Sequence, residues 1–445
     1  MTYPIDEIDV PQPPTQQTKR PGAKLAMASS YIGSSLEMYD FLLYGTAAAL
    51  VFPQLFFSGV DHGVGIALSF VTLAAGYVAR PIGGVIFGHF GDRLGRKKML
   101  IITMVIMGFV SIAVGLLPTA AQIGIWAPIA LVTLRVIQGI AMGGEWAGAT
   151  LMSMEHSSPK RKGFGASIAV SGGPSGAVLA TLVLGAFAAL PEEDFLAWGW
   201  RVPFLLSIVL LVVGLFLRAK VTESPDFEKA QAAAAANKNE GRTAAPLLQV
   251  LRRYPKEVGL SVVGGLAPLF MQSLLATFAL SLAVASGHTR SDALLMLTIA
   301  NAIHIFTIPA TALLSDKIGR RPVMITGAIL GVIGIWPMFA LIQNGSTGLM
   351  LLGFIIGNPL IQALMYGPMG AWMGEMFSTK TRYTGLSLSY QMATTLGAGF
   401  APLIATGLMA AGSGSTTLLA VFFCGLCVVS AIAFIIAKDR KAVES

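Results

Sequence analysis

Hydrophobic residues follow one another in long stretches along the chain, and short polar segments separate these stretches. A bilayer core of about 30 Å needs about 20 apolar residues in a helix, and twelve stretches fit that length. They cover residues 25–51, 63–89, 97–117, 124–151, 163–189, 200–218, 256–286, 291–315, 322–342, 347–374, 383–410 and 414–437. The pattern predicts an all-α integral membrane protein with twelve transmembrane helices.

The longest polar segment between two stretches is 219–255, which contains an alanine run at 232–236 flanked by charges. We interpret it as a partly helical cytoplasmic linker that lies along the membrane surface. The N-terminal residues are acidic and then rich in Pro, Gln and Thr, which is typical of disorder, and they do not form a signal peptide. The predicted parts are a disordered cytoplasmic tail at 1–24, a six-helix bundle at 25–218, the linker, a second six-helix bundle at 256–437 and a cytoplasmic tail at 438–445.

The composition agrees with a membrane protein. Of 445 residues, 54% are hydrophobic and only 12% are charged, against roughly 25% in soluble proteins. The mean hydropathy is +0.72. This balance excludes a disordered chain and a nucleic-acid-binding surface. The two cysteines, Cys424 and Cys427, provide neither a disulfide framework nor a zinc-ligand spacing.

The charged residues indicate the orientation. The chain has 30 Lys and Arg and a formal net charge of +8. We assign all of these cations except Arg80, Arg135, Arg201 and Arg290 to the tails and the even-numbered loops. The loops on the other side carry mainly acidic residues. The positive-inside rule therefore predicts that both termini are cytoplasmic.

A loop signature occurs once in each half of the chain, after the second and the eighth stretch, at an offset of 224 residues from Asp92 to Asp316. The first copy contains Gly88, Gly91, Asp92, Arg93, Gly95, Arg96 and Lys97, and the second contains Asp316, Gly319, Arg320 and Arg321. A second echo relates Glu155 to Glu375 at an offset of 220. Two copies of a six-helix unit in the same orientation are the parallel repeat of one transporter class.

The chemistry of this signature predicts a cytoplasmic gate. Gly95 allows a tight turn, and Asp92 can attract the N-terminus of a neighbouring helix. Arg96 is placed to pair with an acidic group at the cytoplasmic end of another helix. We expect two equivalent sets to clamp the bundles together: Asp92, Arg96 and Glu155 in one half, and Asp316, Arg320 and Glu375 in the other.

Over residues 25–437 the sequence resembles the major facilitator superfamily. Further motifs resemble its metabolite:proton symporter family: Glu37-Met-Tyr-Asp40-Phe, Arg80-Pro-Ile-Gly-Gly, Arg135-Val-Ile-Gln138-Gly, Trp198-Gly-Trp-Arg-Val-Pro-Phe and Glu223-Ser-Pro-Asp-Phe227. The resemblance implies proton-driven uptake of a small organic acid or a zwitterionic osmolyte across a bacterial inner membrane. It implies a protein that works as a monomer, without a cofactor, and with the proton as coupling ion.

Several charged residues lie inside the predicted helices, where each costs about 2.5–3.5 kcal/mol and needs a partner or a function. Glu37 and Asp40 are three residues apart and therefore share a helix face at about 5–6 Å. Two close carboxylates in a poorly solvated site favour proton uptake by at least one of them. The alternative is a fixed network in which both carboxylates are structural partners of arginines.

Depth along the helices suggests how these charges pair. Glu37, Asp40 and Arg135 should lie near the midplane, whereas Arg80 and Glu145 share a level nearer the cytoplasm. We therefore expect Arg135 to pair with Asp40 and Glu37, and Arg80 to pair with Glu145. Protonation of the carboxylate would then release the arginine for an organic anion.

The offset of 224 also places Arg80 on His304, the one ionisable residue that we assign deep in the second half. One hypothesis is that His304 faces the central cavity and helps to hold the carboxylate of the substrate. The alternative is a neutral imidazole that is hydrogen-bonded across a helix contact.

The sequence thus favours a secondary active transporter that takes up a small organic acid, such as a shikimate-like acid or a di- or tricarboxylate, by proton symport and alternating access. A symporter of proline or betaine is the second interpretation, and a drug:proton antiporter is the third. The segment Gly172-Gly-Pro174-Ser-Gly176 lacks the full glycine spacing of the antiporter motif. A receptor or an enzyme gains no support, because the sequence has no phosphate loop, nucleophile elbow or metal-ligand spacing.

Overall fold

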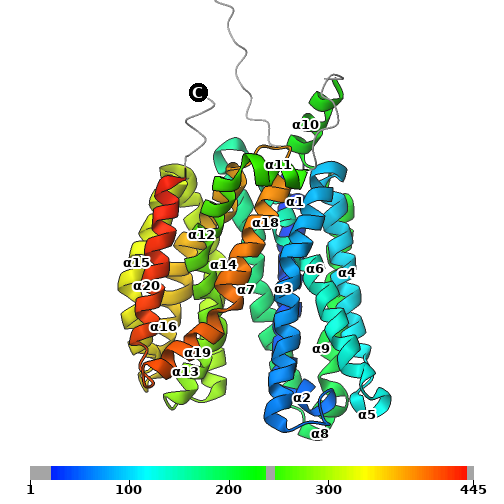
Figure 1. Ribbon diagram of the computed structural model, residues 1–445, viewed down its shortest axis with the longest axis vertical. Coiled ribbons are helices and arrows are strands. Elements are labelled where there is room, and N and C mark those ends of the chain that lie inside the picture. The colour runs from blue at the N-terminus through cyan, green and yellow to red at the C-terminus, as the bar shows by residue number, and fades with distance from the viewer. Residues whose placement is uncertain (1–21, 237–245, 438–445) are drawn as a thin grey trace, which may run out of the picture.

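The computed structural model describes residues 22–236 and 246–437, and all regular elements within them are helical (Figure 1). The tail expected at 1–24 lies outside the described residues except for its last three, and the tail expected at 438–445 lies wholly outside them.

Six long helices form the N-terminal bundle. They are α1 (Ala23–Leu50), α3 (His62–Leu94), α4 (Arg96–Leu116), α6 (Trp126–Glu155), α7 (Lys162–Ala188) and α9 (Arg201–Lys220). Short turns connect them: α2 (Phe52–Leu55), α5 (Ala120–Ile123), η1 (Pro159–Arg161), α8 (Glu192–Asp194) and the π-helical η2 (Phe195–Gly199).

Six long segments also form the C-terminal bundle, but three of them contain a π-helical turn in the middle. These three are α12 (Pro255–Ser273) with η3 (Leu274–Phe278) and α13 (Ala279–Ala285), α16 (Thr347–Ile355) with η4 (Ile356–Gln362) and α17 (Ala363–Glu375), and α18 (Arg382–Thr394) with η5 (Thr395–Gly399) and α19 (Ala401–Ala411). The other three are α14 (Arg290–Ile318), α15 (Arg320–Ile342) and α20 (Thr417–Ile436).

Eleven of the described segments are long and apolar enough to cross a membrane. The twelfth, α1, has 28 residues and a length of about 42 Å, but its serines together with Glu37 and Asp40 lower its hydropathy. Large apolar side chains project outward from the bundles, for example Phe306 at 75% exposure and Leu403 at 71%. Such a surface needs lipid around it. The twelve-helix architecture predicted from the hydropathy pattern is therefore confirmed.

Several helices end later than the hydropathy pattern indicates, among them α3 and α14, which carry the repeated signature. Helix α3 continues to Leu94 instead of residue 89, and α14 continues to Ile318 instead of 315. Their charged last turns can leave the hydrocarbon region and remain helical. Both then stop at a glycine with nearly the same backbone, since Gly95 has φ 103° and ψ 152° and Gly319 has φ 102° and ψ 155°. This left-handed geometry favours glycine at both turns.

Helices α3 and α6 pack unusually closely. A methyl group on Gly83 would overlap the backbone of Ile140, and one on Gly143 would overlap that of Arg80. Small residues allow such contact between membrane helices.

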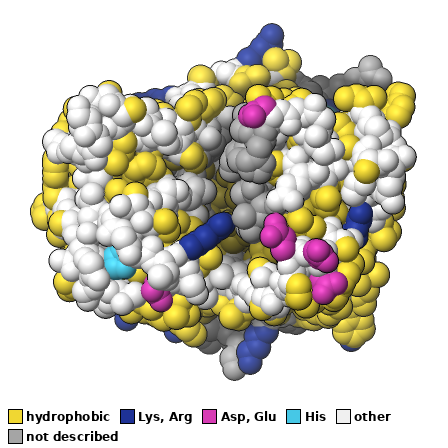
Figure 2. Space-filling view, turned by 90° about the horizontal axis from the view of Figure 1, so that it is seen from below, with side chains coloured by type: hydrophobic (Ala, Val, Ile, Leu, Met, Phe, Trp, Pro, Cys, Tyr) yellow, Lys and Arg dark blue, Asp and Glu magenta, His cyan; other side chains and the backbone are white. Residues whose placement is uncertain are grey.

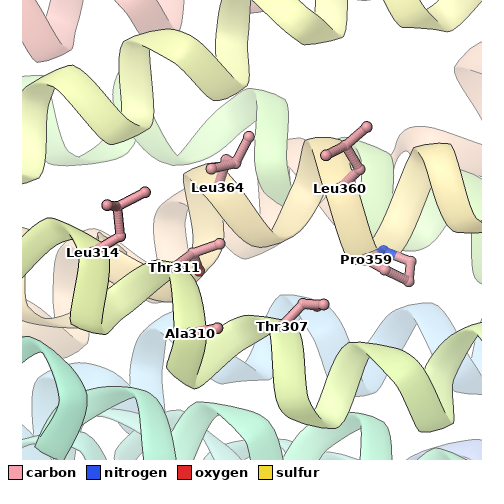
Figure 3. A pocket seen from close by; sticks show the side chains of 7 residues that line it. All are labelled: Thr307, Ala310, Thr311, Leu314, Pro359, Leu360 and Leu364. Carbon is pink, nitrogen blue, oxygen red and sulfur yellow. The ribbon is translucent and has the colours of Figure 1, made fainter.

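The equivalent helices of the second bundle also meet at a glycine, because a methyl group on Gly367 would overlap Thr311 and the carbonyl of Ile308, but they leave a groove beside that contact. Thr307 takes the place of Gly83, and a groove of about 290 Å³ opens between α14 and the segment η4–α17 (Figure 3). Pro359 and Leu364 line its other wall, and at the offset of 220 they too correspond to glycines of α6. Both walls of the groove therefore carry larger residues than the matching positions of the first bundle.

The two bundles meet along two pairs of helices, α7 with α14 and α3 with α18. The linker helices α10 (Pro225–Ala236) and α11 (Pro246–Arg253) lie at one end of the molecule, where α1 also begins and α20 ends (Figure 1). We call this the linker end. There, α11 packs against α3 of the first bundle and against α12 and α18 of the second.

Candidate transport site and gate

At the linker end, each bundle holds a helix N-terminus of the other through an aspartate. Asp92 of α3 accepts hydrogen bonds from the backbone N–H groups of Tyr383 (3.1 Å) and Thr384 (2.9 Å) in α18. Asp316 of α14 accepts them from Gly163 (2.9 Å) and Phe164 (2.8 Å) in α7. A carboxylate at a helix N-terminus accepts hydrogen bonds from the unpaired N–H groups there, and it interacts favourably with the positive end of the helix dipole. We call this pair of contacts the crossed clasp.

Ion pairs lie directly beside the crossed clasp. Arg96 pairs with Glu155 at 3.2 Å, and Arg320 pairs with Glu375 at 3.0 Å, so the same pair occurs once in each bundle. Glu155 is fully buried and also pairs with Arg382 of the other bundle at 3.0 Å. The contacts expected from the repeated signature are thus confirmed.

The remaining residues of the signature fit this arrangement in different ways. Gly88 and Gly91 let α3 approach α18, because a methyl group on either would overlap Thr384 or Tyr383. Lys97 donates from Nζ to the carbonyl of Ala219 at 2.9 Å. The side chain of Arg93 is exposed and that of Arg321 is half-buried.

The start of the linker is part of the same structure, which the sequence analysis did not foresee. Glu223 accepts hydrogen bonds from the N–H groups of Arg96 and Lys97 at 3.1 Å, which caps α4. The hydroxyl of Ser224 donates to Glu155, and the ring of Phe227 lies 5.4 Å from the Arg96 guanidinium. These residues belong to a motif that had been used only to recognise the family.

At the other end of the molecule the bundles separate. The Thr395 hydroxyl donates to the Tyr77 carbonyl at 3.4 Å. The crossed clasp and the ion pairs between the bundles lie nearer the linker end than this contact. Figure 2 views this end and shows a hollow between the two halves. The structure is therefore closed at the linker end and open at the opposite end.

Arg80 and Arg135 of the N-terminal bundle both lie close to the same aromatic ring, that of Phe41. The guanidinium carbon of Arg80 lies 5.2 Å from the Phe41 ring and 4.6 Å from the Tyr77 ring. That of Arg135 lies 5.5 Å from Phe41 and 4.2 Å from Tyr44. Within the described chain, neither arginine has a carboxylate within ion-pair distance. The bundle thus holds two cations in aromatic surroundings.

The predicted ion pair between Arg135 and Asp40 is wrong. Arg135 donates to the side-chain oxygen of Gln138 at 2.7 Å, and Gln138 donates in turn to Ser111 at 3.2 Å. Asp40 is 1% exposed, accepts a hydrogen bond from Ser207 at 2.7 Å, and interacts with Ser111. Neutral side chains therefore lie between the two charges. The second oxygen of Asp40 has no hydrogen-bond partner among the described residues.

The predicted pair of Arg80 with Glu145 is also wrong. Glu145 is buried and binds Arg218, which reaches it from the end of α9, and it accepts a hydrogen bond from Thr103 at 2.6 Å. The sequence predicts a loop position for Arg218, because it ends an apolar stretch. Arg80 instead points to Phe41 and Tyr77, with one nitrogen 3.6 Å from the sulfur of Met142.

Glu37 differs from the other intramembrane carboxylates because it is partly exposed. Its charge interacts with those of Arg80, Glu145 and Arg218, but it forms no hydrogen bond or ion pair that we find within the described ranges. It is thus half-buried and within electrostatic reach of Arg80.

His304 lies in the second bundle, as expected, at 3% exposure. It is close to Gln362 and to the backbone of Asn358, and its Nδ1 has no hydrogen-bond partner in the described part of the chain. Near the linker end, the stacked rings of Trp146 and Tyr390, with centroids 3.4 Å apart, join the two bundles. The described residues contain no cluster of His, Cys, Asp and Glu suited to a metal ion.

Comparison with known proteins identifies the family. Residues 26–249 match the family model of sugar (and other) transporters, and residues 260–445 match that of the major facilitator superfamily. The shikimate transporter of Escherichia coli is 37% identical over 94% of this chain and 95% of its own. The chain belongs to the major facilitator superfamily.

Other relatives show a wider range of substrates. The glycine betaine/proline/ectoine/pipecolic acid transporter of Dickeya dadantii is 32% identical over 86% of this chain and 77% of its own. Among solved structures, the proton:xylose symporter XylE of E. coli superposes with a TM-score of 0.74 over 94% of this chain and 96% of its own, at 17% identity. The relatives confirm the metabolite:proton symporter resemblance, and the chain is a transporter and not an enzyme.

Proposed function

We propose that this transporter takes up a small organic acid together with protons across a bacterial inner membrane. The observation that carries the proposal is Arg80, a permanent cation held between Phe41 and Tyr77 without a carboxylate of its own in the described chain. An intramembrane charge needs a partner or a function. A carboxylate of the substrate is the partner that fits a guanidinium best.

Asp40 and Glu37 are the proposed proton carriers. Asp40 is buried with a single strong donor, Ser207, so its charged form lacks the hydrogen bonds that would stabilise it. Glu37 is half-buried, and its charge interacts with that of Arg80. A proton on either carboxylate would strengthen the attraction between Arg80 and an entering anion, which is the coupling that symport requires.

A zwitterionic osmolyte is supported less well, although several relatives carry proline or betaine. A quaternary ammonium binds in a cage of aromatic rings. The rings nearest the site are Phe41, Tyr44 and Tyr77, and they already surround Arg80 and Arg135. A second cation there would be repelled.

We further propose that the linker end is cytoplasmic and that the crossed clasp, with its ion pairs, is the cytoplasmic gate. Lys and Arg concentrate in the tails and loops of this end. The structure would then be the outward-open state, in which the clasp holds α7 and α18. Release of these contacts would open the path to the cytoplasm.

Purified protein in liposomes with an imposed inward proton gradient tests the proposal. Labelled shikimate should accumulate above its external concentration, and substrate addition should make the outside alkaline. Arg80→Gln should raise the half-saturation constant at least about 30-fold, since a hydrogen bond between charged groups contributes about 2–3 kcal/mol. Binding of betaine but not of shikimate, citrate or 2-oxoglutarate would contradict the proposal.

A further inference from the structure

Four polar residues of the second bundle correspond to Arg80, to its contacts Tyr77 and Met142, and to Gln138, which binds Arg135. At the offset of 224, Tyr77 corresponds to Asn301 and Arg80 to His304. At the offset of 220, Gln138 corresponds to Asn358 and Met142 to Gln362. We call Asn301, His304, Asn358 and Gln362 the amide cluster.

The contacts in the two bundles also correspond. Arg80 approaches Met142 in the first bundle, and His304 approaches Gln362 in the second. The side-chain amide of Asn358 donates to Asn301 at 3.0 Å. The amide cluster therefore lies between α14 and η4. This place corresponds to that of Arg80 and Gln138 between α3 and α6 in the first bundle.

The amide cluster has hydrogen-bonding capacity that the described residues do not use. Gln362 is 1% exposed; its side chain lies close to His304, but neither its oxygen nor its nitrogen meets hydrogen-bond geometry with a described residue. Nδ1 of His304, at 3% exposure, has no hydrogen-bond partner among these residues either. A buried amide without partners costs about 1–3 kcal/mol, so such a group calls for an explanation.

The backbone at this point is unusual as well. Asn358 and Gln362 both lie in the π-helical η4, and Pro359 lies between them. π-Helical turns often mark functional sites, because they reorient side chains at the expense of regular hydrogen bonds. The equivalent part of α6 is a regular α-helix.

We propose that the amide cluster is a second, uncharged subsite that binds hydroxyl groups of the substrate, while Arg80 holds the carboxylate. This subsite rests on the proposed organic-acid transport. Amide and imidazole groups both donate and accept hydrogen bonds, as hydroxyl groups do. The first bundle then selects for negative charge, and the second selects for hydroxylated acids over acids of the same shape without hydroxyl groups.

Two matched pairs of carboxylates test the subsite by competition binding to the full chain in liposomes. Shikimate and cyclohex-1-ene-1-carboxylate share a ring and a carboxylate, but only shikimate has hydroxyl groups. Malate and succinate differ by one hydroxyl group in the same way. In at least one pair, the wild type should bind the hydroxylated acid at least tenfold more tightly, because a site built for a hydroxyl group discriminates against analogues that lack it.

Gln362→Met introduces the residue found at the equivalent position of the first bundle, with little change in side-chain volume. It should reduce the preference for the hydroxylated acid to about onefold to threefold. Asn358→Leu should act in the same way and carries the test if the first variant does not fold. Thr311→Val is the matched control, because its hydroxyl donates to Ala363 between the same two segments but outside the cluster. The control should keep the preference of the wild type.

The outcomes separate the two proposals. Two outcomes overturn the subsite but not the proposed function. In the first, the wild type binds the acids without preferring the hydroxylated member of either pair. In the second, a folded Gln362→Met or Asn358→Leu variant keeps the preference of the wild type. If none of the four acids binds the wild type, the proposed function fails and the subsite fails with it. If Arg80→Gln binds neither acid of a pair whereas Gln362→Met still binds both, the result supports the proposed division, in which the first bundle binds the carboxylate and the second binds the hydroxyl groups.

Discussion

The two bundles share one backbone plan but differ in chemistry at the same level of the membrane. The first contains Arg80, Arg135, Asp40 and the buried pair of Glu145 with Arg218, on helices packed through glycines. Among the described residues, the second has His304 and neutral groups there, such as the amides of Asn358 and Gln362 and the hydroxyl of Tyr366, and its segment α16–η4–α17 is interrupted by a π-helical turn. Duplication therefore preserved the gate in both halves, whereas the interior of each half changed separately.

This difference suggests a division of work. Buried charges need fixed partners, and the close packing of α3 against α6 supplies a rigid frame for them. Neutral hydrogen-bonding groups tolerate a more open bundle, such as the one with the groove beside Thr307 and Pro359 (Figure 3). Four predictions test whether energy coupling belongs to the first bundle and recognition also to the second.

The largest effect is expected from the carboxylates of α1. If Asp40 or Glu37 carries the proton, Asp40→Asn or Glu37→Gln should lower the accumulation ratio to about one, because the substrate then crosses without a coupled proton. Exchange of labelled for unlabelled substrate should continue. The accumulation ratio and the exchange rate are measured in the same liposomes. If both variants still accumulate the substrate to the full ratio, Asp40 and Glu37 do not couple transport to the proton, and the prediction fails.

A large loss of stability should follow Glu145→Gln. The change leaves Arg218 buried without its counter-charge, which costs about 3–5 kcal/mol. Glu375→Gln in the second bundle is the comparison, because the Glu375 side chain is 33% exposed and its loss should cost about 1 kcal/mol. Thermal unfolding in detergent measures both variants. Equal shifts would show that the first bundle does not depend on its buried charges.

An intermediate effect is expected at the crossed clasp. Asp92→Asn and Asp316→Asn should each weaken the closed linker end by about 1–2 kcal/mol, because a neutral amide binds helix N–H groups less strongly. Transport should slow several-fold with little change in the half-saturation constant. A cysteine introduced at Met154, which is 1% exposed, should react faster with thiol reagents from the linker end. An effect of only one of the two aspartates would contradict a twofold gate.

The smallest effect is expected from His304→Ala. If His304 contacts the substrate, the half-saturation constant for an anion should rise about 3–10-fold, while the amount of protein in the membrane changes little. The appropriate measurements are uptake kinetics and a blot of the same membranes. An unchanged constant in a well-folded variant would make His304 a packing residue.

Much of the fold could be predicted from the sequence, because hydropathy and the repeated signature encode it directly. The equivalence of Asp92 and Asp316 followed from a constant offset, and each was expected to bind a helix N-terminus, although the sequence did not identify α18 and α7 as the helices concerned. The partners of Arg80 and Arg135 did not follow. Depth in the membrane determines the level of a side chain but not its direction around the helix axis.

Neutral residues were the second source of error. Gln138 and Ser207 lie between the charges of the first bundle, yet amides and hydroxyls have no distinctive signal in a hydropathy pattern. Arg218 was missed for a related reason, since a cation at the end of an apolar stretch has the appearance of a loop residue. The contact of Glu223 with α4 depends on a turn after α9 that spacing alone does not reveal.

The crossed clasp has a consequence for how freely the gate can vary in evolution. Its two aspartates bind main-chain N–H groups, and every residue except proline supplies such a group. The receiving positions are Gly163 and Phe164 in one half and Tyr383 and Thr384 in the other, with no side chain in common. The aspartates are constrained by their charge, and two receiving positions are constrained by side-chain contacts: a methyl group on Gly163 would overlap Arg320, and the Thr384 hydroxyl also donates to Asp92 at 2.8 Å. Residue 164 contributes to the clasp through its N–H, so its side chain can vary without loosening the closed state, whereas proline there or at residue 384 should break it.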